Sequence, residues 1–164
     1  MPGGHLKEQQ IHPAERLALP GGGLADIDLR MIPLVRALWA LNFTTMGCCQ
    51  DLGESIEHNG HGSPVQAKDR QRWATFYKGH AWLKLPVNDA ERLIGILGGD
   101  QIFGHRMRRW THPEAWQAVL WLIPTDDGCA RPEPTAQITF PAPQIKDLVN
   151  LLTTRWKTLN DARL

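Results

Sequence analysis

The sequence has few of the features that identify common functional classes. Three cysteines in 164 residues are too few for a disulfide framework. The formal net charge of +1 provides no global field to attract nucleic acid or a membrane surface, so such a partner would need a local patch. No apolar run approaches the roughly 18 residues of a membrane span. The first ten residues lack the basic and apolar regions of a secretory signal. We therefore predict a cytoplasmic protein without a membrane partner.

Standard nucleotide and metal motifs are also missing. Neither a GxGxxG pattern nor a Walker loop occurs, and no CxxC or HExxH spacing is present. The pair Gly98 and Gly99 follows an apolar helical pattern, a position where glycines end a helix and do not cradle phosphate. Because no motif indicates a cofactor, the cofactor is unknown. A binding or catalytic site has to be predicted from individual residues.

Apolar periodicity predicts a single α+β domain over residues 26–164. The preceding residues, 1–25, contain PGG and PGGG and predict a flexible arm. Helical spacing predicts helices at 26–42, 88–99 and 143–159, and alternation or short apolar runs predict strands at 43–49, 80–87, 115–124 and 136–140. The natural packing is a two-layer sandwich, in which a four-stranded sheet packs with about three helices.

Two segments carry further structural expectations. Residues 115–124 are apolar on both faces, which is typical of a central strand. Residues 50–78 look irregular apart from one helical turn, and a loop of this length in a compact domain is usually functional or disordered. We expect a cleft where the strand ending at Cys49 meets this loop and the start of the strand at His80.

The stretch TTMGCCQDLGESIEHNGH, residues 44–61, supports three interpretations. Because adjacent strand residues point to opposite faces, Cys48 and Cys49 cannot both face one pocket, and one of them could be a small core residue. Either could be a catalytic thiol, with His58, His61 or His80 as the activating group. The third interpretation is zinc bound by Cys49, His58 and His61, with Cys129 as a distant fourth ligand. Because this spacing fits no standard pattern, we predict no metal and keep that ligand set as an alternative.

A basic region lies between residues 64 and 112. It holds nine Lys or Arg against four acidic residues, a net charge of +5 (9 − 4). Two clusters stand out, KDRQRWATFYK and HRMRRW. Their basic side chains could bind phosphates while their aromatic rings stack on bases. A solvated surface whose aromatic residues pack on the core is the simpler interpretation, since no RNP1 signature is present.

The segment leading into the two cysteines resembles that of known families. The helix IDLRMIPLVRALWALNF, followed by a strand that ends in Thr45-Met46-Gly47-Cys48-Cys49-Gln50-Asp51, resembles short uncharacterised proteins of actinobacterial and phage genomes. Cys49 and Gln50 match their Thr-x-x-Ser-Cys-Gln-Gly motif, and this resemblance implies no known function. The order of elements is also similar to that of the methyltransferase-type proteins of wybutosine synthesis. Their motif continues with an arginine that this sequence lacks, which leaves their catalysis and RNA contact without a counterpart here.

The sequence therefore predicts a small ligand-binding accessory protein of the kind carried by a phage or mobile element. The ligand would be a nucleotide, a nucleic acid or a polar metabolite. The residues expected to bind it are Gln50, Asp51, Arg70, Arg72, Trp73, His80, Trp82 and Arg106. The alternatives are a cysteine-dependent or RNA-modifying transferase-type enzyme, with Cys49 or Cys48 as its catalytic residue, and a protein-interaction module whose tryptophans mark an apolar patch.

Overall fold

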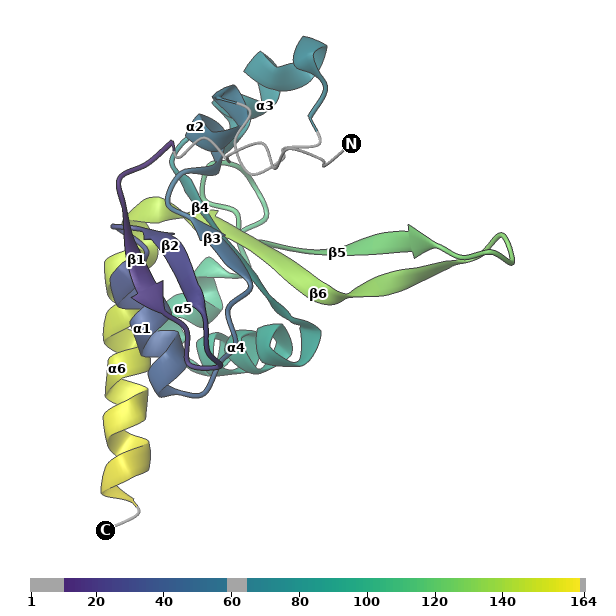
Figure 1. Cartoon of the computed structure of the whole chain (residues 1–164). Coiled ribbons are helices and arrows are strands. Elements are labelled where there is room, and N and C mark those ends of the chain that lie inside the picture. Colours follow the sequence, from purple (N-terminus) through teal and green to yellow (C-terminus); the bar gives the residue numbers. More distant parts are fainter. Residues whose placement is uncertain (1–10, 59–64, 163–164) are drawn as a thin grey trace.

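The computed structural model describes residues 11–58 and 65–162. These residues form a four-stranded antiparallel sheet, a separate two-stranded hairpin and six α-helices (Figure 1). The predicted α+β fold with a four-stranded sheet is confirmed. The three helices expected from the sequence are present as α1, α4 and α6, and the other three are shorter. None of the described helices is both long and apolar enough to cross a membrane.

The elements follow one another in the order shown by the colours of Figure 1. The strands are β1 (Ala14–Ala18), β2 (Leu24–Asp28), β3 (Gly47–Cys49), β4 (His80–Pro86), β5 (Gln117–Pro124) and β6 (Ala130–Pro141). The α-helices are α1 (Ile32–Ala40), α2 (Leu52–Glu57), α3 (Arg70–Tyr77), α4 (Val87–Gly99), α5 (Gln101–Arg106) and α6 (Ile145–Asp161). Two 3-10 turns, η1 (Ala67–Asp69) and η2 (Ala142–Gln144), precede α3 and α6.

The main sheet has the strand order β3-β4-β6-β5, and its two central strands, β4 and β6, bury alternate residues on one face. On β4, Ala81, Leu83 and Leu85 are buried, and on β6 their partners Phe140, Ile138 and Ala136 are buried with them. These side chains form one core cluster with the apolar faces of α1, α4 and α6. Alternate residues of these strands and the apolar stripe of each helix therefore meet in one interface between the sheet and the helices.

The N-terminal region differs from the flexible arm that we expected for residues 1–25. Residues 14–18 and 24–28 pair as an antiparallel hairpin, with Ala14 opposite Asp28. Leu17 and Ile27 from this hairpin are buried in the main core cluster. The glycines that suggested flexibility form its turn, where Gly22 and Gly23 adopt the positive φ angles that glycine tolerates. Residues 1–10 lie outside the described part of the chain.

The segment 50–78, expected to be irregular, contains two helices instead. Asp51 accepts a hydrogen bond from the Glu54 amide and so caps α2. Helix α2 packs against α3, and Gly53 is buried at their contact, beside the backbone of Ala74 and Lys78. The six-residue and eight-residue helices are too short to give a clear apolar period, which explains why the pattern did not reveal them.

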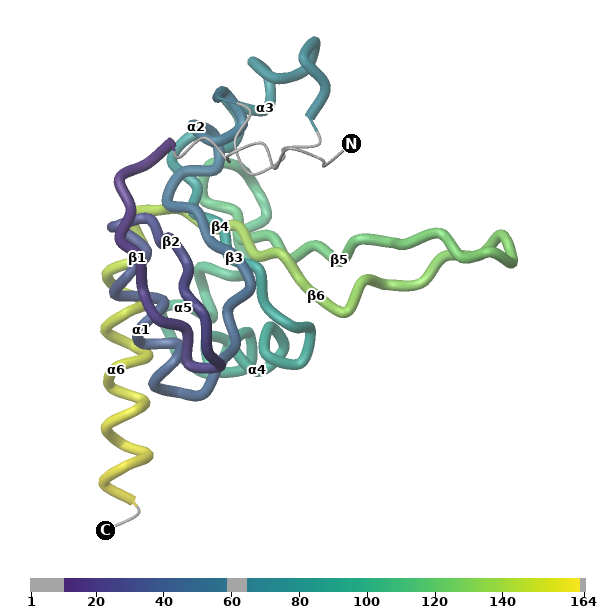
Figure 2. Tube along the Cα trace, viewed as in Figure 1, coloured from purple at the N-terminus to yellow at the C-terminus, as the bar shows by residue number. Residues whose placement is uncertain are grey.

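The expectation of a central strand at residues 115–124 is wrong. β5 is an edge strand of the sheet, and most of its residues are exposed. Together with β6 it forms a long hairpin that extends away from the helices, as the trace in Figure 2 shows. Its apolar character on both faces therefore does not reflect burial within the described chain.

Candidate functional site

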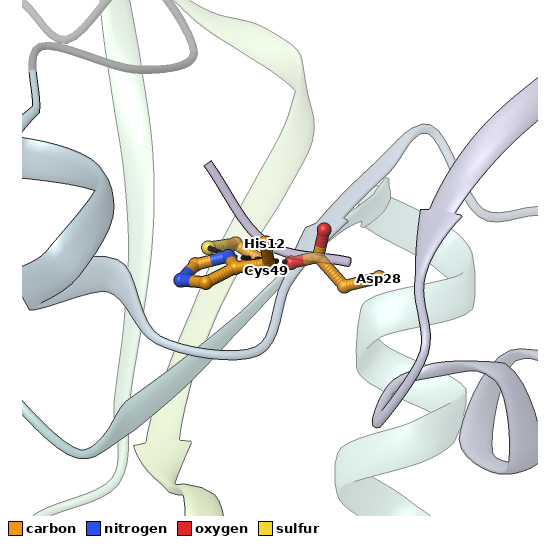
Figure 3. Close-up of side chains that lie close together, drawn as sticks. All are labelled: His12, Asp28 and Cys49. Atoms are coloured by element: carbon orange, nitrogen blue, oxygen red, sulfur yellow. Dashed lines mark hydrogen bonds and ion pairs between the residues drawn. The ribbon is translucent and has the colours of Figure 1, made fainter. Parts of the chain in front are cut away.

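Three buried residues with metal-binding side chains meet beside the end of β3. His12, Asp28 and Cys49 each offer one ligand atom, and these atoms all lie within 4.8 Å of one another (Figure 3). His12 Nδ1 lies 3.1 Å from Asp28 Oδ2 and 3.7 Å from Cys49 Sγ. One ring nitrogen of His12 therefore faces both the carboxylate and the sulfur.

The three side chains come from three separate segments. His12 precedes β1, Asp28 ends β2, and Cys49 ends β3. The Gln50 backbone amide donates to Asp28 Oδ2 at 2.8 Å, which links β2 to the end of β3. His12, from the part expected to be a flexible arm, and Asp28, at the end of the hairpin, thus supply two of the three side chains.

The second ring nitrogen of His12 faces another carboxylate. His12 Nε2 lies 2.9 Å from Glu54 Oε2 on α2. His12 is buried, whereas the Glu54 side chain keeps about 44% of its surface exposed. The imidazole is therefore held from both sides, by Asp28 at Nδ1 and by Glu54 at Nε2.

Both neighbouring cysteines are held as thiols in the metal-free protein. Burial, together with the negative charge of Asp28, raises the pKa of Cys48 to about 12. Burial also raises the pKa of Cys49 to about 12, with Asp28 adding to the effect and the bond to Asp51 O opposing it. The Cys49 thiol donates that bond to the Asp51 carbonyl oxygen at 3.2 Å. Neither cysteine has the lowered pKa that an activated thiol nucleophile requires.

The structure places the two cysteines on opposite faces, as the strand geometry predicted. Cys48 pairs with Leu83 and packs against the main core cluster, and Cys49 pairs with Trp82 and reaches His12. Of the two, Cys49 is the one at the candidate site.

Gln50 and Asp51, predicted to bind ligand, lie beside this cluster but are engaged with the backbone. Gln50 Oε1 accepts from the Arg30 amide at 3.2 Å. Asp51 Oδ1 accepts from the Glu54 amide at 3.1 Å, and Oδ2 accepts from the Gly79 amide at 2.9 Å. Asp51 thus joins α2 to the start of β4 and positions the cluster.

The aromatic residues predicted for stacking belong to other contacts. Trp73 stacks on Tyr77 within α3, with ring centroids 6.2 Å apart. His80 is buried, donates from Nε2 to the Pro113 carbonyl at 2.9 Å and stacks on the ring of His112. The Trp82 indole donates to Gln137 Oε1 at 3.0 Å on the polar face of the sheet. Of these three residues, Trp82 adjoins the His12 cluster, because it pairs with Cys49 across β3 and β4.

The three predicted phosphate-binding arginines do not gather at one place. Arg70 and Arg72 lie on α3, whereas Arg106 lies on α5, and Figure 1 shows these helices well apart. The Arg106 guanidinium pairs with Asp147 of α6 at 2.8 Å and lines an open pocket of about 420 Å³ with Arg109 and Glu114. Since Arg109 in turn pairs with Glu114, both basic groups already face carboxylates.

The alternative metal set predicted from the sequence differs from the observed cluster. His58 Nδ1 lies 2.9 Å from the Glu54 carbonyl oxygen of its own helix, and His61 is outside the described residues. Only Cys49 is common to both sets. Sequence reasoning missed His12 and Asp28, because no spacing rule connects residues 12, 28 and 49, and the pairing of β1 with β2 is what brings the first two segments together.

Comparison of this chain with protein-family models, curated proteins and solved structures finds no match. The resemblances suggested by the sequence therefore stay predictions. Function has to be argued from the geometry of the site.

Proposed function

We propose that this chain is a zinc-binding protein whose metal is held by His12 Nδ1, an Asp28 carboxylate oxygen and Cys49 Sγ. The observation that carries the proposal is the convergence of these three buried ligand atoms within 4.8 Å of one another. Imidazole, thiolate and carboxylate are all zinc ligands at about 2.0–2.3 Å, so a shift of each side chain by an ångström or so would close the site.

The arrangement around His12 supports a metal more specifically than three neighbouring side chains alone. A metal-bound histidine usually donates its other ring N–H to a carboxylate, which fixes the tautomer and the ring orientation. Glu54 Oε2 occupies that position, 2.9 Å from His12 Nε2. The presence of a thiolate donor favours zinc over magnesium or calcium, which select oxygen ligands.

A zinc ion at this place would have one coordination position left over. Among the described residues the cluster offers three protein ligands, and zinc sites with three protein ligands complete their coordination with water or a bound molecule. We place the predicted polar ligand at this position, where the carboxylate or phosphate oxygen of a small molecule would coordinate the metal. This keeps the ligand-binding function expected from the sequence near the end of the strand at Cys49, with a metal ion in place of the arginines as the group that binds the ligand.

The competing explanation is a metal-free network, in which a protonated His12 bridges Asp28 and Glu54. Measurement of the metal content of the purified full chain separates the two. We expect about one zinc per chain by elemental analysis. Native mass spectrometry should show the metal-bound mass, and the denatured protein should not. In the cobalt-substituted protein, a thiolate-to-cobalt charge-transfer band would report Cys49 as a ligand, and added inorganic phosphate should shift the visible bands if it occupies the remaining position.

Matched variants identify the ligands. His12→Asn and Cys49→Ser should each lose zinc, whereas Cys48→Ser and His58→Asn should keep it. Cys48 adjoins Cys49 but packs against the core, and the ring of His58 lies beside the Glu54 carbonyl oxygen of its own helix. Wild-type protein without zinc, even after refolding in excess zinc, would contradict the proposal and leave the metal-free network as the explanation.

A further inference from the structure

The two basic segments of the sequence, KDRQRWATFYK and HRMRRW, are brought together by aromatic contacts. His112, in the connection between α5 and β5, stacks on Phe76 of α3 with ring centroids 4.2 Å apart. His112 also stacks on His80, whose ring donates to the Pro113 carbonyl oxygen at 2.9 Å. These contacts hold the connection against α3, so the two segments, more than 30 positions apart in the chain at Phe76 and His112, share one surface.

The cations of this surface have no carboxylate partners. Elsewhere in the described chain, Arg16, Lys84, Arg92, Arg106 and Arg109 each pair with an acidic side chain. Within residues 11–58 and 65–162, no ion pair forms at the cations of α3, its flanking residues and the connection, which are Lys68, Arg70, Arg72, Lys78 and Arg108. Residues 65–80 alone carry +3 (4 − 1), although the whole chain carries only +1. This concentration of unpaired charge favours an anionic partner.

Trp110 adds an aromatic ring to the same surface. It is 85% exposed, the largest exposed fraction among the large apolar side chains described. Its indole makes no ring contact or hydrogen bond with the part of the chain that the structure describes. Because Trp110 is two positions from His112, their Cα atoms lie at most about 7 Å apart. An open aromatic face therefore lies close to the cations of α3.

We propose that this basic surface, made of Lys68, Arg70, Arg72, Lys78, Arg108 and Trp110, binds single-stranded nucleic acid. The cations would meet phosphates, and the indole would stack on an unpaired base. Three of the five cations are arginines, whose planar guanidinium matches the geometry of a phosphate. Bases that stack on protein side chains are those of single strands, loops and ends, so the exposed ring favours a single strand over a duplex.

The surface does not have the form of a membrane-binding helix. Such a helix turns its apolar face outward, into the lipid headgroups. In α3, Ala74 is buried, and the rings of Phe76 and Tyr77 pack with those of His112 and His80. The apolar side of α3 is therefore occupied within the protein, and the exposed side is basic.

The test measures the binding of fluorescent oligomers of about 15 nucleotides to the full chain, by anisotropy over a range of salt concentrations. Oligo-dT and oligo-U distinguish DNA from RNA as the source of the strand, and binding of either supports the proposal. The logarithm of the association constant should fall with the logarithm of the salt concentration, with a slope of about −0.7 for each phosphate contacted. A duplex of the same length should bind more weakly.

Two variants separate the charge from the stacking. Arg72→Gln should make the salt slope less steep by about 0.7, because one phosphate contact is lost. Trp110→Ala should weaken binding by about 5–150-fold at every salt concentration and leave the slope unchanged.

The matched controls are Arg155→Gln and Trp156→Ala, which should both bind like the wild type. Arg155 is exposed and unpaired like Arg72, and Trp156 is an exposed tryptophan. Both lie toward the C-terminal end of α6, at the opposite end of the molecule from α3 (Figure 1). Since all four side chains are exposed, thermal unfolding should be nearly unchanged in every variant.

Several results would overturn the proposal. One is the absence of binding at about 50 mM salt and about 100 µM protein, where even non-specific binding would be detected. Others are wild-type affinity in Trp110→Ala, or equal effects of Arg72→Gln and Arg155→Gln. Equal affinity for the duplex, or equally strong binding of poly-glutamate, would show a surface that takes any polyanion. The basic surface contains none of the three proposed zinc ligands, so either proposal can fail while the other holds.

Discussion

His12 and Glu54 meet at 2.9 Å between Nε2 and Oε2, although 42 positions separate them in the chain. This contact turns the other ring nitrogen toward Asp28 and Cys49. A carboxylate on α2 therefore sets the orientation of an imidazole that the N-terminal segment supplies. The contact also makes α2 part of the proposed metal centre without contributing a ligand.

Removal of this carboxylate should weaken zinc binding without abolishing it. Outer-shell partners of metal-bound histidines typically contribute 10–100-fold to metal affinity, so we expect Glu54→Ala to raise the Kd for zinc by about that factor. Competition with a chromophoric chelator measures it. Glu57→Ala is the control, because Glu57 lies on the same helix and is exposed. Equal zinc affinity in the Glu54→Ala variant and the wild type would show that Glu54 does not support the metal.

The sequence predicted the parts of the fold that have a strong apolar period. Helices α4 and α6 and strand β4 lie where the spacing placed them, because each buries one face in the common core. The first helix starts later than predicted, at Ile32, because residues 24–28 form β2, and β6 is longer than the predicted strand, since it begins at Ala130. It failed at β5, where a run apolar on both faces is typical of a central strand but belongs here to an exposed edge. Periodicity detects apolar faces and does not say what covers them.

The candidate site was only half predictable. The sequence indicated that polar residues follow a strand ending at Cys49, where β3 does end, and the opposite orientation of Cys48 and Cys49 followed from strand geometry. The partners His12 and Asp28 could not be found, since the glycines of residues 21–23 indicated flexibility and not a hairpin turn. Strands of only five residues also leave little periodic signal in the sequence.

The two raised thiol pKa values predict alkaline instability of the metal-free protein. Because both values lie near 12 in the native state against 9.0 for an ordinary thiol, the native protein keeps two protons that the unfolded chain releases. Between about pH 9 and 12 the unfolded state binds fewer protons, so the free energy of unfolding falls as pH rises. Below about pH 9 this contribution to stability is fully present. Urea unfolding in the presence of a chelator and a reductant, at about pH 8 and at about pH 10.5, measures it.

Lysine and tyrosine also titrate in this range, so the control is the double variant Cys48→Ala with Cys49→Ala. It should be less stable at about pH 8 but should lose less stability on the change to about pH 10.5. Equal losses in the variant and the wild type would mean that the thiols do not cause the pH dependence.

We expect Asp51 to contribute to the stability of the fold, a role separate from the ligand binding predicted from the sequence. Its two carboxylate oxygens accept from the Glu54 and Gly79 amides, so Asp51→Ala removes the cap of α2 and leaves the Gly79 amide without its acceptor. Loss of a cap costs about 1 kcal/mol, and an unsatisfied amide costs about 1–3 kcal/mol more. The comparison is Asp100→Ala, which removes only the cap of α5. Chemical denaturation should therefore show a larger loss for Asp51→Ala, and equal losses would contradict the bridging role.

Gly53 makes the close approach of α2 and α3 possible, and a single methyl group there should separate them. A Cβ at this position would lie well inside contact distance of Lys78 N and Ala74 O, and backbone atoms cannot turn aside as a side chain can. We expect Gly53→Ala to lower the free energy of unfolding by about 1–3 kcal/mol or more. Because the same helix carries Glu54, the variant should also weaken zinc binding.

Gly95→Ala is the matched control for this substitution. Gly95 lies within α4, where a Cβ would meet nothing within 4 Å, so alanine should stabilise the helix by about 0.5–1 kcal/mol. Both substitutions add one methyl group. Urea unfolding should nevertheless show a lower free energy of unfolding for Gly53→Ala and a higher one for Gly95→Ala. A Gly53→Ala variant as stable as the wild type would mean that α2 and α3 are not held at the distance the structure shows. The contact between these helices would then not fix the position of Glu54 beside His12.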